Sequence, residues 1–415
     1  MFAVASRIGT SLAATRCRSV PGRRAAHRGE SIFSVGSGSG ASDSTLNEAT
    51  ELATSGGQVM AVIRWDRGHQ QVRALAALWL MTIVGAGSGV AQERRPIGDT
   101  PNAREPLALR QSLRFGSLNG NNDAFARVAF VALRNDGSIV VADDEAHHVA
   151  VYTADGRLLK RLGRQGQGPG EFETPWLVSV SRGDSVFVWD AAQARVSVFS
   201  PSLGFVRSFQ VPGGWTVNSL RELPSGKLLF SAFEPLSRHA LHIASRDGVV
   251  ERSFAPIDIP RGVTRFHASL LGGSAIVVDS MIAFSHKSPY QIDVFDLRGR
   301  HLRSCVGSAS ATTPPARVIA VAPNGGTQLQ WGKYVHSTAL LPGPADRVVL
   351  NLIVDRENDR RVLDAVDLRT CQLLRRATLP VPIFLNDARN GAIAGFMELD
   401  YPEVLVYSLS APTPR

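Results

Sequence analysis

A glycine-rich decapeptide, residues 163–172, is the first part of the sequence with the composition of a chemical site. It reads GRQGQGPGEF. Glycine-rich loops cradle phosphates when a helix follows them, because the helix N-terminus presents free N–H groups. The next residues, EFETPWLVSVS, have no helical pattern. We therefore expect a structural turn, with positive φ at its glycines and a φ fixed by its proline. These turn residues are Gly163, Gly166, Gly168, Pro169 and Gly170.

Three consecutive acids, Asp143, Asp144 and Glu145, form a carboxylate cluster. Such a cluster attracts Ca²⁺ or a basic partner, although its spacing is not that of an EF-hand. A solvated loop is the other interpretation. The histidines are isolated or adjacent in sequence, no CxxC pair is present, and no hydrolase or nucleotide-binding motif stands in a supporting context. The sequence therefore offers no complete set of metal ligands or catalytic residues.

The formal net charge of +9 is unevenly distributed along the 415 residues. Residues 1–91 hold nine arginines and five acids, so +4 of the charge lies there. The remaining excess is scattered arginine without a basic run, which favours a solvated surface over a nucleic-acid footprint. We expect no nucleic-acid partner.

The first hundred residues do not have the pattern of a folded domain. Residues 60–91 combine a basic leader, a short apolar stretch and small residues before Gln92, which is typical of a secretory signal peptide. Residues 1–59 are interpreted as a non-native or disordered extension upstream of the true start at Met60. A transit peptide is the alternative, because the first 29 residues contain six arginines and no acid. Residues 92–105 read as a polar linker.

Beyond residue 105 the sequence repeats. The segment 138–163 aligns without gaps on 185–209, at an offset of 47 residues, and Asp143 falls on Asp190. Both acids follow a strand pattern, so we expect them to cap turns by accepting backbone N–H bonds. Four weaker copies follow, and residues 304–330 look like an insertion. The spacing predicts an all-β fold for 106–415: a six-bladed β-propeller of four-stranded antiparallel blades. We expect Pro106–Phe115 to close the ring as the outer strand of the last blade.

The segment VADDEAHHVAVYTADGRLLKRLGRQGQGPGEFETP resembles the NHL repeat, and in particular that of secreted bacterial six-bladed propellers with a GxGPGEF crossing. The match is strong over about 138–209 and degenerate elsewhere. The resemblance implies the fold. It does not specify a function, because this architecture hosts lyases, lactonases, sensors and binding modules.

The repeats place several polar turns on one face of the predicted propeller. The turns after Asp143 and Asp190 correspond to residues 285–290 in the fourth repeat, which include a histidine and a lysine. Loops on rigid supports commonly carry function. We therefore predict a ligand-binding face near the axis formed by Asp144, Glu145, His286 and Lys287. Trp176, Trp215, Trp331 and Tyr334 lie in or near inter-blade segments, as core residues or as part of a binding face.

These expectations favour a periplasmic or secreted monomer that binds or scaffolds a protein or small-molecule ligand. After cleavage of the signal peptide it would not span a membrane. This interpretation requires no cofactor. Ca²⁺ in the channel or on a loop is the ion that the sequence leaves open. The alternative is a metal-assisted lyase or lactonase with an ion in the central channel. Three convergent His, Asp, Glu or Asn side chains would favour the enzyme, and an apolar or arginine-lined funnel would favour binding.

Two of the three cysteines, Cys305 and Cys371, follow the third strand pattern of successive repeats. An oxidising compartment would permit a disulfide. Outer strands of neighbouring blades are expected to diverge, however, and a disulfide needs Cα atoms within about 7 Å. The sequence therefore favours two free thiols.

Overall fold

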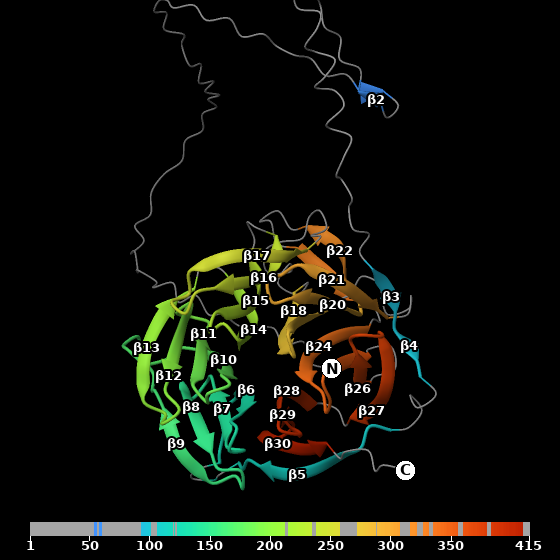
Figure 1. Ribbon diagram of the computed structural model, residues 1–415. Coiled ribbons are helices and arrows are strands. Elements are labelled where there is room, and N and C mark those ends of the chain that lie inside the picture. Colours follow the sequence, from blue (N-terminus) through green and yellow to red (C-terminus); the bar gives the residue numbers. More distant parts are fainter. Residues whose placement is uncertain are drawn as a thin grey trace, which may run out of the picture. The chain divides into compact units, whose positions relative to one another are not determined.

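A computed structural model of the chain is shown in Figure 1. It describes residues 54–55, 58–59, 93–100, 106–118, 120, 123–211, 215–234, 238–257, 272–287, 289–307, 316–321, 327–331, 335–355, 360–379 and 383–409. The chain divides into two units, Met1–Gly87 and Ser88–Arg415. In the first unit, β1 (Thr54–Ser55) pairs antiparallel with β2 (Gln58–Val59). The expected signal peptide, residues 60–91, and the rest of the expected extension lie outside the described residues.

The second unit is an all-β propeller of six blades, as the repeats predicted. Blade one consists of β6 (Val128–Leu133), β7 (Ile139–Asp143), β8 (His148–Tyr152) and β9 (Leu158–Leu162). Blade two consists of β10 (Pro175–Val180), β11 (Val186–Asp190), β12 (Arg195–Phe199) and β13 (Phe205–Gln210). Blade three consists of β14 (Thr216–Glu222), β15 (Leu228–Glu234), β16 (His239–Ala244) and β17 (Val250–Pro256).

The second half of the ring follows the same plan. Blade four consists of β18 (Gly273–Val278), β19 (Met281–His286), β20 (Gln291–Asp296) and β21 (His301–Val306). Blade five consists of β24 (Val335–Pro342), β25 (Val348–Asp355), β26 (Arg360–Asp367) and β27 (Gln372–Leu379). Blade six consists of β28 (Ile383–Arg389), β29 (Ala392–Glu398), β30 (Pro402–Leu409) and the N-terminal β5 (Leu109–Phe115).

The hydrophobic core lies between the blades rather than at the axis. Each strand in the middle of a blade packs on both of its faces, so β7 and β11 are buried along their whole length and read as nearly continuous apolar runs. The described residues form six apolar clusters, and each cluster joins one pair of neighbouring blades. The cluster between blades six and one includes Val131, Phe396 and Val404, so the circle of contacts is complete.

The ring is joined where its first and last parts meet. Strand β5 pairs antiparallel with β30, from Phe115 opposite Val404 to Leu109 opposite Leu409. The Nε atom of Arg114 donates to Oε1 of Glu403 at 2.8 Å, which fixes this pairing at one end. The expected pairing of the N-terminal strand with the last blade is therefore present, and the outer edge of β30 is covered.

The segment expected to be a polar linker also contributes strands. Strand β3 (Arg94–Pro96) pairs parallel with β21, and β4 (Gly98–Asp99) pairs parallel with β27. Each is a fifth strand on the outer edge of its sheet. The strand pairing itself uses backbone groups, and Ile97 is the one apolar side chain of QERRPIGD that packs against the cluster between blades four and five. The linker interpretation of residues 92–105 is thus wrong for its described part, which is a strap across blades four and five.

The expected insertion begins after residue 306, because Ser304–Val306 belong to β21. Within it, β22 (Ala316–Val321) pairs antiparallel with β23 (Thr327–Trp331). This hairpin forms a sheet of its own.

The glycine-rich crossing from blade one to blade two is a turn, and it leads into β10 rather than into a helix. Gly163 has φ 73°, and a Cβ there would lie 2.4 Å from the Phe172 ring, which is fully buried. Pro169 and Gly170 occupy the centre of a hydrogen-bonded turn in which the N–H of Glu171 donates to the carbonyl of Gly168. Gly170 has φ 74°, as such a turn requires.

One glycine of the crossing differs from expectation. Positive φ is present at Gly163, Gly166 and Gly170 but not at Gly168. Gly168 is the first residue of the turn, a position that needs no left-handed backbone. Its N–H donates to Oε2 of Glu171 at 2.9 Å, and a Cβ there would lie 2.8 Å from the same oxygen. Close approach of a side chain, not backbone conformation, accounts for this glycine.

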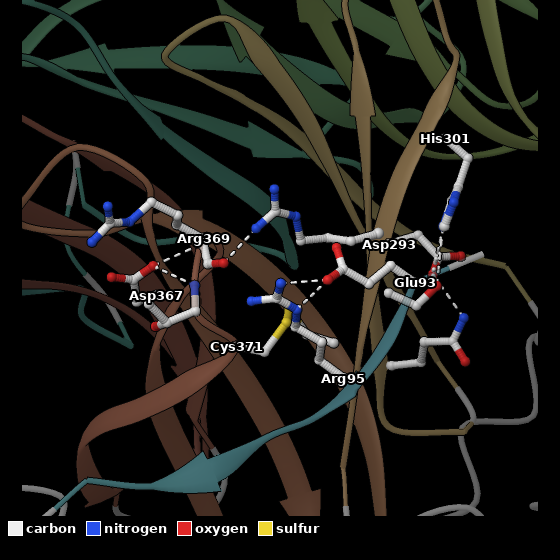
Figure 2. Close-up of a disulfide and its surroundings, with 12 residues drawn as sticks. Glu93, Arg95, Asp293, His301, Asp367, Arg369 and Cys371 are labelled. Atoms are coloured by element: carbon white, nitrogen blue, oxygen red, sulfur yellow. Dashed lines mark hydrogen bonds and ion pairs between the residues drawn. A yellow bond between two sulfur atoms is a disulfide. The ribbon is translucent and has the colours of Figure 1, made fainter. Parts of the chain in front are cut away.

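Cys305 and Cys371 form a disulfide, so the expectation of two free thiols is wrong. Figure 2 shows its surroundings, with Arg95 of the strap beside Cys371. Cys305 lies near the end of β21, and Cys371 lies in the turn before β27. Because the strands of a blade twist, the end of one outer strand reaches the start of the next, and the two Cα atoms are 5.2 Å apart. The strap β3–β4 crosses this same junction.

Replacing both Cys305 and Cys371 with alanine should lower the free energy of unfolding by about 4 kcal/mol. The disulfide closes a loop between residues 66 positions apart, and that loop restricts the unfolded chain. Urea denaturation with and without reductant measures the effect: reductant should lower the midpoint of the wild type and leave the double variant unchanged. Reactive thiols at both positions in denatured, non-reduced protein would contradict the assignment.

Candidate functional site: the central channel

Six innermost strands surround the axis of the propeller: β6, β10, β14, β18, β24 and β28 (Figure 1). Each one begins at the face that carries the inter-blade crossings and the turns after the second strands. We call this face the upper face. The opposite face carries the turns after the first and third strands, including the Asn135–Gly137 turn of blade one. This arrangement brings the start of every innermost strand to the upper mouth of the channel.

Five of the six innermost strands contain a β-bulge. The register against the second strand shifts by one residue in β6, β10, β14, β24 and β28, whereas β18 is regular. A bulged residue leaves the strand's alternation, and bulges are frequent where a protein re-aims a side chain. The residues at the shifts are Ala129, Trp176, Asn218, Thr338 and Asn386.

The bulged residues are accessible, although several of their neighbours in the strands are buried. Trp176 is 46% exposed, although Pro175 and Leu177 on either side of it are buried. Thr338 is exposed between two buried residues in the same way. A tryptophan held in this way at a rigid strand start presents a large apolar surface to a ligand. We therefore treat the bulges as the lining of the upper mouth.

Lys287 lies at the same mouth and is fixed by its backbone. Its N–H donates to the carbonyl of Gly272, and its carbonyl accepts from the N–H of Ser337 in blade five. Its Nζ donates to Oδ1 of Asn218 at 3.1 Å, so the side chain spans from blade four to the bulge of blade three. Burial lowers the pKa of Lys287 to about 8. The ammonium group is thus a desolvated cation at the channel wall.

A second cation, Arg221, lies deeper on β14, three residues or roughly 10 Å below Asn218. Burial lowers its pKa, the charge of Asp387 across the channel opposes this effect, and the charge of Arg389 adds to it. Among the described residues, no carboxylate lies within 4.0 Å of the side-chain nitrogens of Lys287 or Arg221. Within the described chain, the channel therefore carries two cations that have no carboxylate in contact.

The acidic and amide groups of β28 are used for structure. Oδ2 of Asp387 accepts from the N–H of Leu133 at 3.0 Å, and Oδ1 of Asn386 accepts from the N–H of Val131 at 3.2 Å. At the lower end, the Arg389 guanidinium donates to the carbonyls of Val180 and Ser181. These bonds tie blade six to blades one and two. These side chains of β28 therefore serve to hold neighbouring blades together and have bonding partners within the ring.

The turn residues Asp143 and Asp190 cap the upper turns of blades one and two. Asp143 accepts from the backbone N–H groups of Ala126, Arg127 and Ala146. Asp190 accepts from the N–H groups of Glu173, Thr174, Ala192 and Gln193. Both side chains are buried. Each carboxylate thus joins its own turn to the crossing or segment that precedes the blade.

Asp144 and Glu145 do not form the exposed pair on which the predicted binding face relied. The Asp144 side chain is fully buried and receives the Nε–H of Arg127 at 2.8 Å. Glu145 is 54% exposed, and its Oε1 lies 2.8 Å from Nη1 of the same arginine. The sequence argument treated the three acids as one solvated loop because the partner, Arg127, lies 17 residues away. Both oxygens of Asp143 and both of Asp144 thus already accept hydrogen bonds, whereas Ca²⁺ needs several carboxylate oxygens together.

His286 and Lys287 diverge, as neighbouring residues of an extended chain do. Nε2 of His286 lies 2.7 Å from Oδ2 of Asp293 on the flank of blade four. Asp293 also accepts from Gln291 and from Ser304, and His301 lies nearby at 3.7 Å (Figure 2). Burial alone would raise the pKa of Asp293, but the hydrogen bond and charge of His286, with the other donors, lower it to about 2. His286 therefore belongs to a separate polar network.

The structure thus separates the four predicted ligand-binding residues. Lys287 reaches the channel, while Asp144, Glu145 and His286 have partners elsewhere. Sequence reasoning left Trp176 open as a core residue or as part of a binding face, and it missed Asn218 and Arg221. A polar or aromatic residue inside a strand of buried neighbours, as in PWLVSV, was the available signal. Trp215, by contrast, is buried against Phe230.

An open polar pocket of about 550 Å³ lies at the rim, beside the crossing into blade two. Gln167, Gln193, Arg195 and Gln210 line it. The Arg195 guanidinium already donates to the carbonyls of Gln167, Gly168 and Glu171. The single cation of this pocket is therefore committed to the turn.

Across the part of the chain that the structure describes, no three His, Cys, Asp or Glu side chains are grouped to hold a metal ion. None of its described segments is a helix long and apolar enough to cross a membrane.

Comparisons with known proteins agree on the fold. A family model, DUF5128, described as a 6-bladed beta-propeller, matches residues 123–313. Among solved structures, a predicted exported protein from Bacteroides fragilis is 11% identical with a TM-score of 0.52, covering 77% of this chain and all of that one. A DUF4221 member from Bacteroides vulgatus is 7% identical with a TM-score of 0.48, covering 75% and 100%. Virginiamycin B lyase from Staphylococcus aureus is 10% identical with a TM-score of 0.45, covering 73% and 100%.

A comparison with curated protein sequences gave no match. At these identities the likeness shows a six-bladed propeller and nothing further about this chain.

Asp144→Ala should lower the free energy of unfolding by about 2 kcal/mol, since it removes a buried carboxylate that accepts charged hydrogen bonds from Arg127. Glu145→Ala is the matched control, because it removes an exposed carboxylate from the same arginine and should change stability by less than about 0.5 kcal/mol. Chemical denaturation of both variants measures the difference. Equal stability of the two variants would show that Asp144 is not held as described.

The low pKa of Asp293 predicts a pH dependence of stability. Its folded pKa of about 2 lies below the unfolded value of about 3.9, so its contribution is complete above about pH 4 and is lost as the pH falls through 2. Between pH 5 and pH 2 the wild type should lose about 2 kcal/mol more stability than Asp293→Asn. Asp247→Asn, at an exposed acid, should keep the wild-type slope. A wild-type slope in Asp293→Asn would refute the assignment.

Proposed function

We propose that the protein is an extracytoplasmic binding module that holds a ligand at the upper mouth of its propeller channel. The observation that carries this proposal is the series of bulges in five innermost strands, which turns Trp176, Asn218 and Thr338 out of buried strands. Each bulge gives up ladder hydrogen bonds at the most constrained part of the sheet. Bulges repeated at one level of the channel favour a selected lining over a packing irregularity.

The alternative, a metal-assisted lyase or lactonase, needs several convergent metal ligands in the channel. The polar groups of β28 that could serve, Asn386 and Asp387, accept backbone N–H groups of β6. The cations Lys287 and Arg221 would repel a metal ion. The channel therefore supports binding better than metal chemistry, and Arg221 in its wall favours the binding module under the criterion of an apolar or arginine-lined funnel.

The extracytoplasmic location is supported by three features. Residues 60–91 have the pattern of a signal peptide. The disulfide Cys305–Cys371 requires an oxidising compartment to persist. The structurally similar Bacteroides fragilis protein is described as exported. The scattered basic charge gives no reason to invoke nucleic acid, and we expect a monomer.

Export predicts a defined N-terminus. Cleavage after Ala91 should give a mature chain that begins at Gln92, because small residues precede that bond. Mass spectrometry of the protein recovered from the periplasm or medium measures the mass of the mature chain. A cytoplasmic protein that retains residues 60–91 would contradict the location.

The binding site can be tested with a panel of small aromatic, sugar and amino-acid compounds, screened by ligand-observed NMR. Trp176→Ala should weaken any compound that binds the channel by about tenfold or more, because a central tryptophan supplies much of the contact. Val206→Ala is the control, since Val206 is 56% exposed on the outer strand β13. Binding that depends on Val206 and not on Trp176, or turnover that appears only with a divalent metal, would reject the proposed function.

A further inference from the structure

The chemistry of the channel mouth indicates what kind of ligand it takes. Lys287 has three N–H donors on its ammonium group, and one of them is used by Asn218. The described residues offer no second acceptor to the ammonium group, so two of its donors are open to a ligand as far as the described chain goes. The backbone of Lys287 is bonded to Gly272 on one side and to Ser337 on the other, and the hydrogen bond from Nζ to Asn218 holds the end of the side chain. The cation is therefore presented in a fixed place.

A desolvated cation is stabilised most by an anion. Burial removes Lys287 from water, and the described part of the chain places no carboxylate within 4.0 Å of it. The described residues likewise place no carboxylate in contact with Arg221 below it, although the charge of Asp387 across the channel acts on it from a distance. A neutral ligand would hydrogen-bond to Lys287 but would leave its desolvated charge without a counter-ion in contact.

The wall next to Asn218 is aromatic. Trp176 and Asn218 are the bulged residues of neighbouring innermost strands, and each lies four residues before the end of its strand. The two are therefore at one level of the mouth. Trp176 offers an accessible apolar surface on the strand next to the one that carries Asn218. A ligand that uses both must combine an anionic group with an apolar body.

We propose that the channel mouth binds a small organic anion, with its carboxylate or phosphate group on Lys287 and Asn218 and its apolar body against Trp176. This inference rests on the proposed function and adds the class of ligand. Arg221 contributes from below through its charge. Carboxylates and phosphates share the chemistry that the ammonium group recognises, so the experiment compares them directly.

Three probes of similar shape separate the charge from the aromatic ring: benzoate, phenyl phosphate and the neutral benzyl alcohol. Their dissociation constants are measured by calorimetry or NMR titration on the purified protein and its variants. Both anions should bind more tightly than benzyl alcohol. Lys287→Met should weaken the anions by about tenfold or more and leave benzyl alcohol unchanged. Trp176→Ala should weaken all three probes.

The controls keep the result interpretable. Lys227→Met removes a lysine that pairs with Glu251 on the lower face and should bind like the wild type. Lys287→Arg retains the charge and should retain anion binding within a few-fold. Arg221→Met tests the deeper charge separately and should weaken the binding of the anions a few-fold. These two variants decide the question if Lys287→Met does not fold.

The outcomes distinguish the inference from the proposed function. The anion site is overturned if Lys287→Met and Arg221→Met bind the anions as tightly as the wild type does. It is also overturned if benzyl alcohol binds as well as benzoate, or if neither anion binds at about 10 mM. If Trp176→Ala weakens the binding of benzyl alcohol in those cases, the proposed function as a binding module is retained and only the anion site is lost. If Trp176→Ala leaves all binding unchanged, the mouth itself is rejected.

Discussion

The open edge of the last blade is the constraint on which the rest of the molecule depends. A ring of separate sheets has a core only if every blade packs on two neighbours, and blade six has just three strands of its own in sequence order. The N-terminal strand β5 supplies the fourth by pairing with β30. Because β5 and β6 belong to the same stretch of chain, this pairing ties the last blade to the first. Side chains from β28 reinforce the junction by bonding to the backbone of β6.

Closure also determines what the channel can do. Innermost strands that are fixed by packing on both sides can tolerate a bulge, and the extra residue then projects from a rigid base. Trp176 and Asn218 are held in this way, and Lys287 is held by backbone bonds to two blades. The outer strap and the Cys305–Cys371 disulfide restrain blades four and five at the rim. Those are the blades whose backbone positions Lys287.

The repeat pattern was enough to predict the fold, the closing strand and the turns, because each rests on local spacing. Asp143 and Asp190 recur at one position, and a recurring acid after a strand is a cap. The strap was missed because Arg94–Pro96 pairs through its backbone and shows no apolar pattern. The disulfide was missed because the spacing of strands in the sequence does not reveal the twist of the blades. That twist brings Cys305 to the turn at Cys371.

The site was predicted in part. Lys287 was chosen because it lies in a turn equivalent to those after Asp143 and Asp190. Its position in the channel, however, depends on a hydrogen bond to Asn218, 69 residues away. Asp144 was taken for an exposed acid because its partner, Arg127, comes before the strand. A bulge changes register without changing composition, so Trp176 could not be told from a core residue. Long-range pairing decides each of these cases.

The most direct measurement concerns the lysines, of which the chain has only four: Lys160, Lys227, Lys287 and Lys333. Protein labelled with ¹³C at the lysine Cε should give four resolvable signals, and replacement of Lys287 by arginine identifies its signal. Titration with benzoate should shift the Lys287 signal and leave those of Lys160 and Lys227 in place. Shifts confined to the other lysines, or no shift at saturating benzoate, would contradict an anion-binding channel.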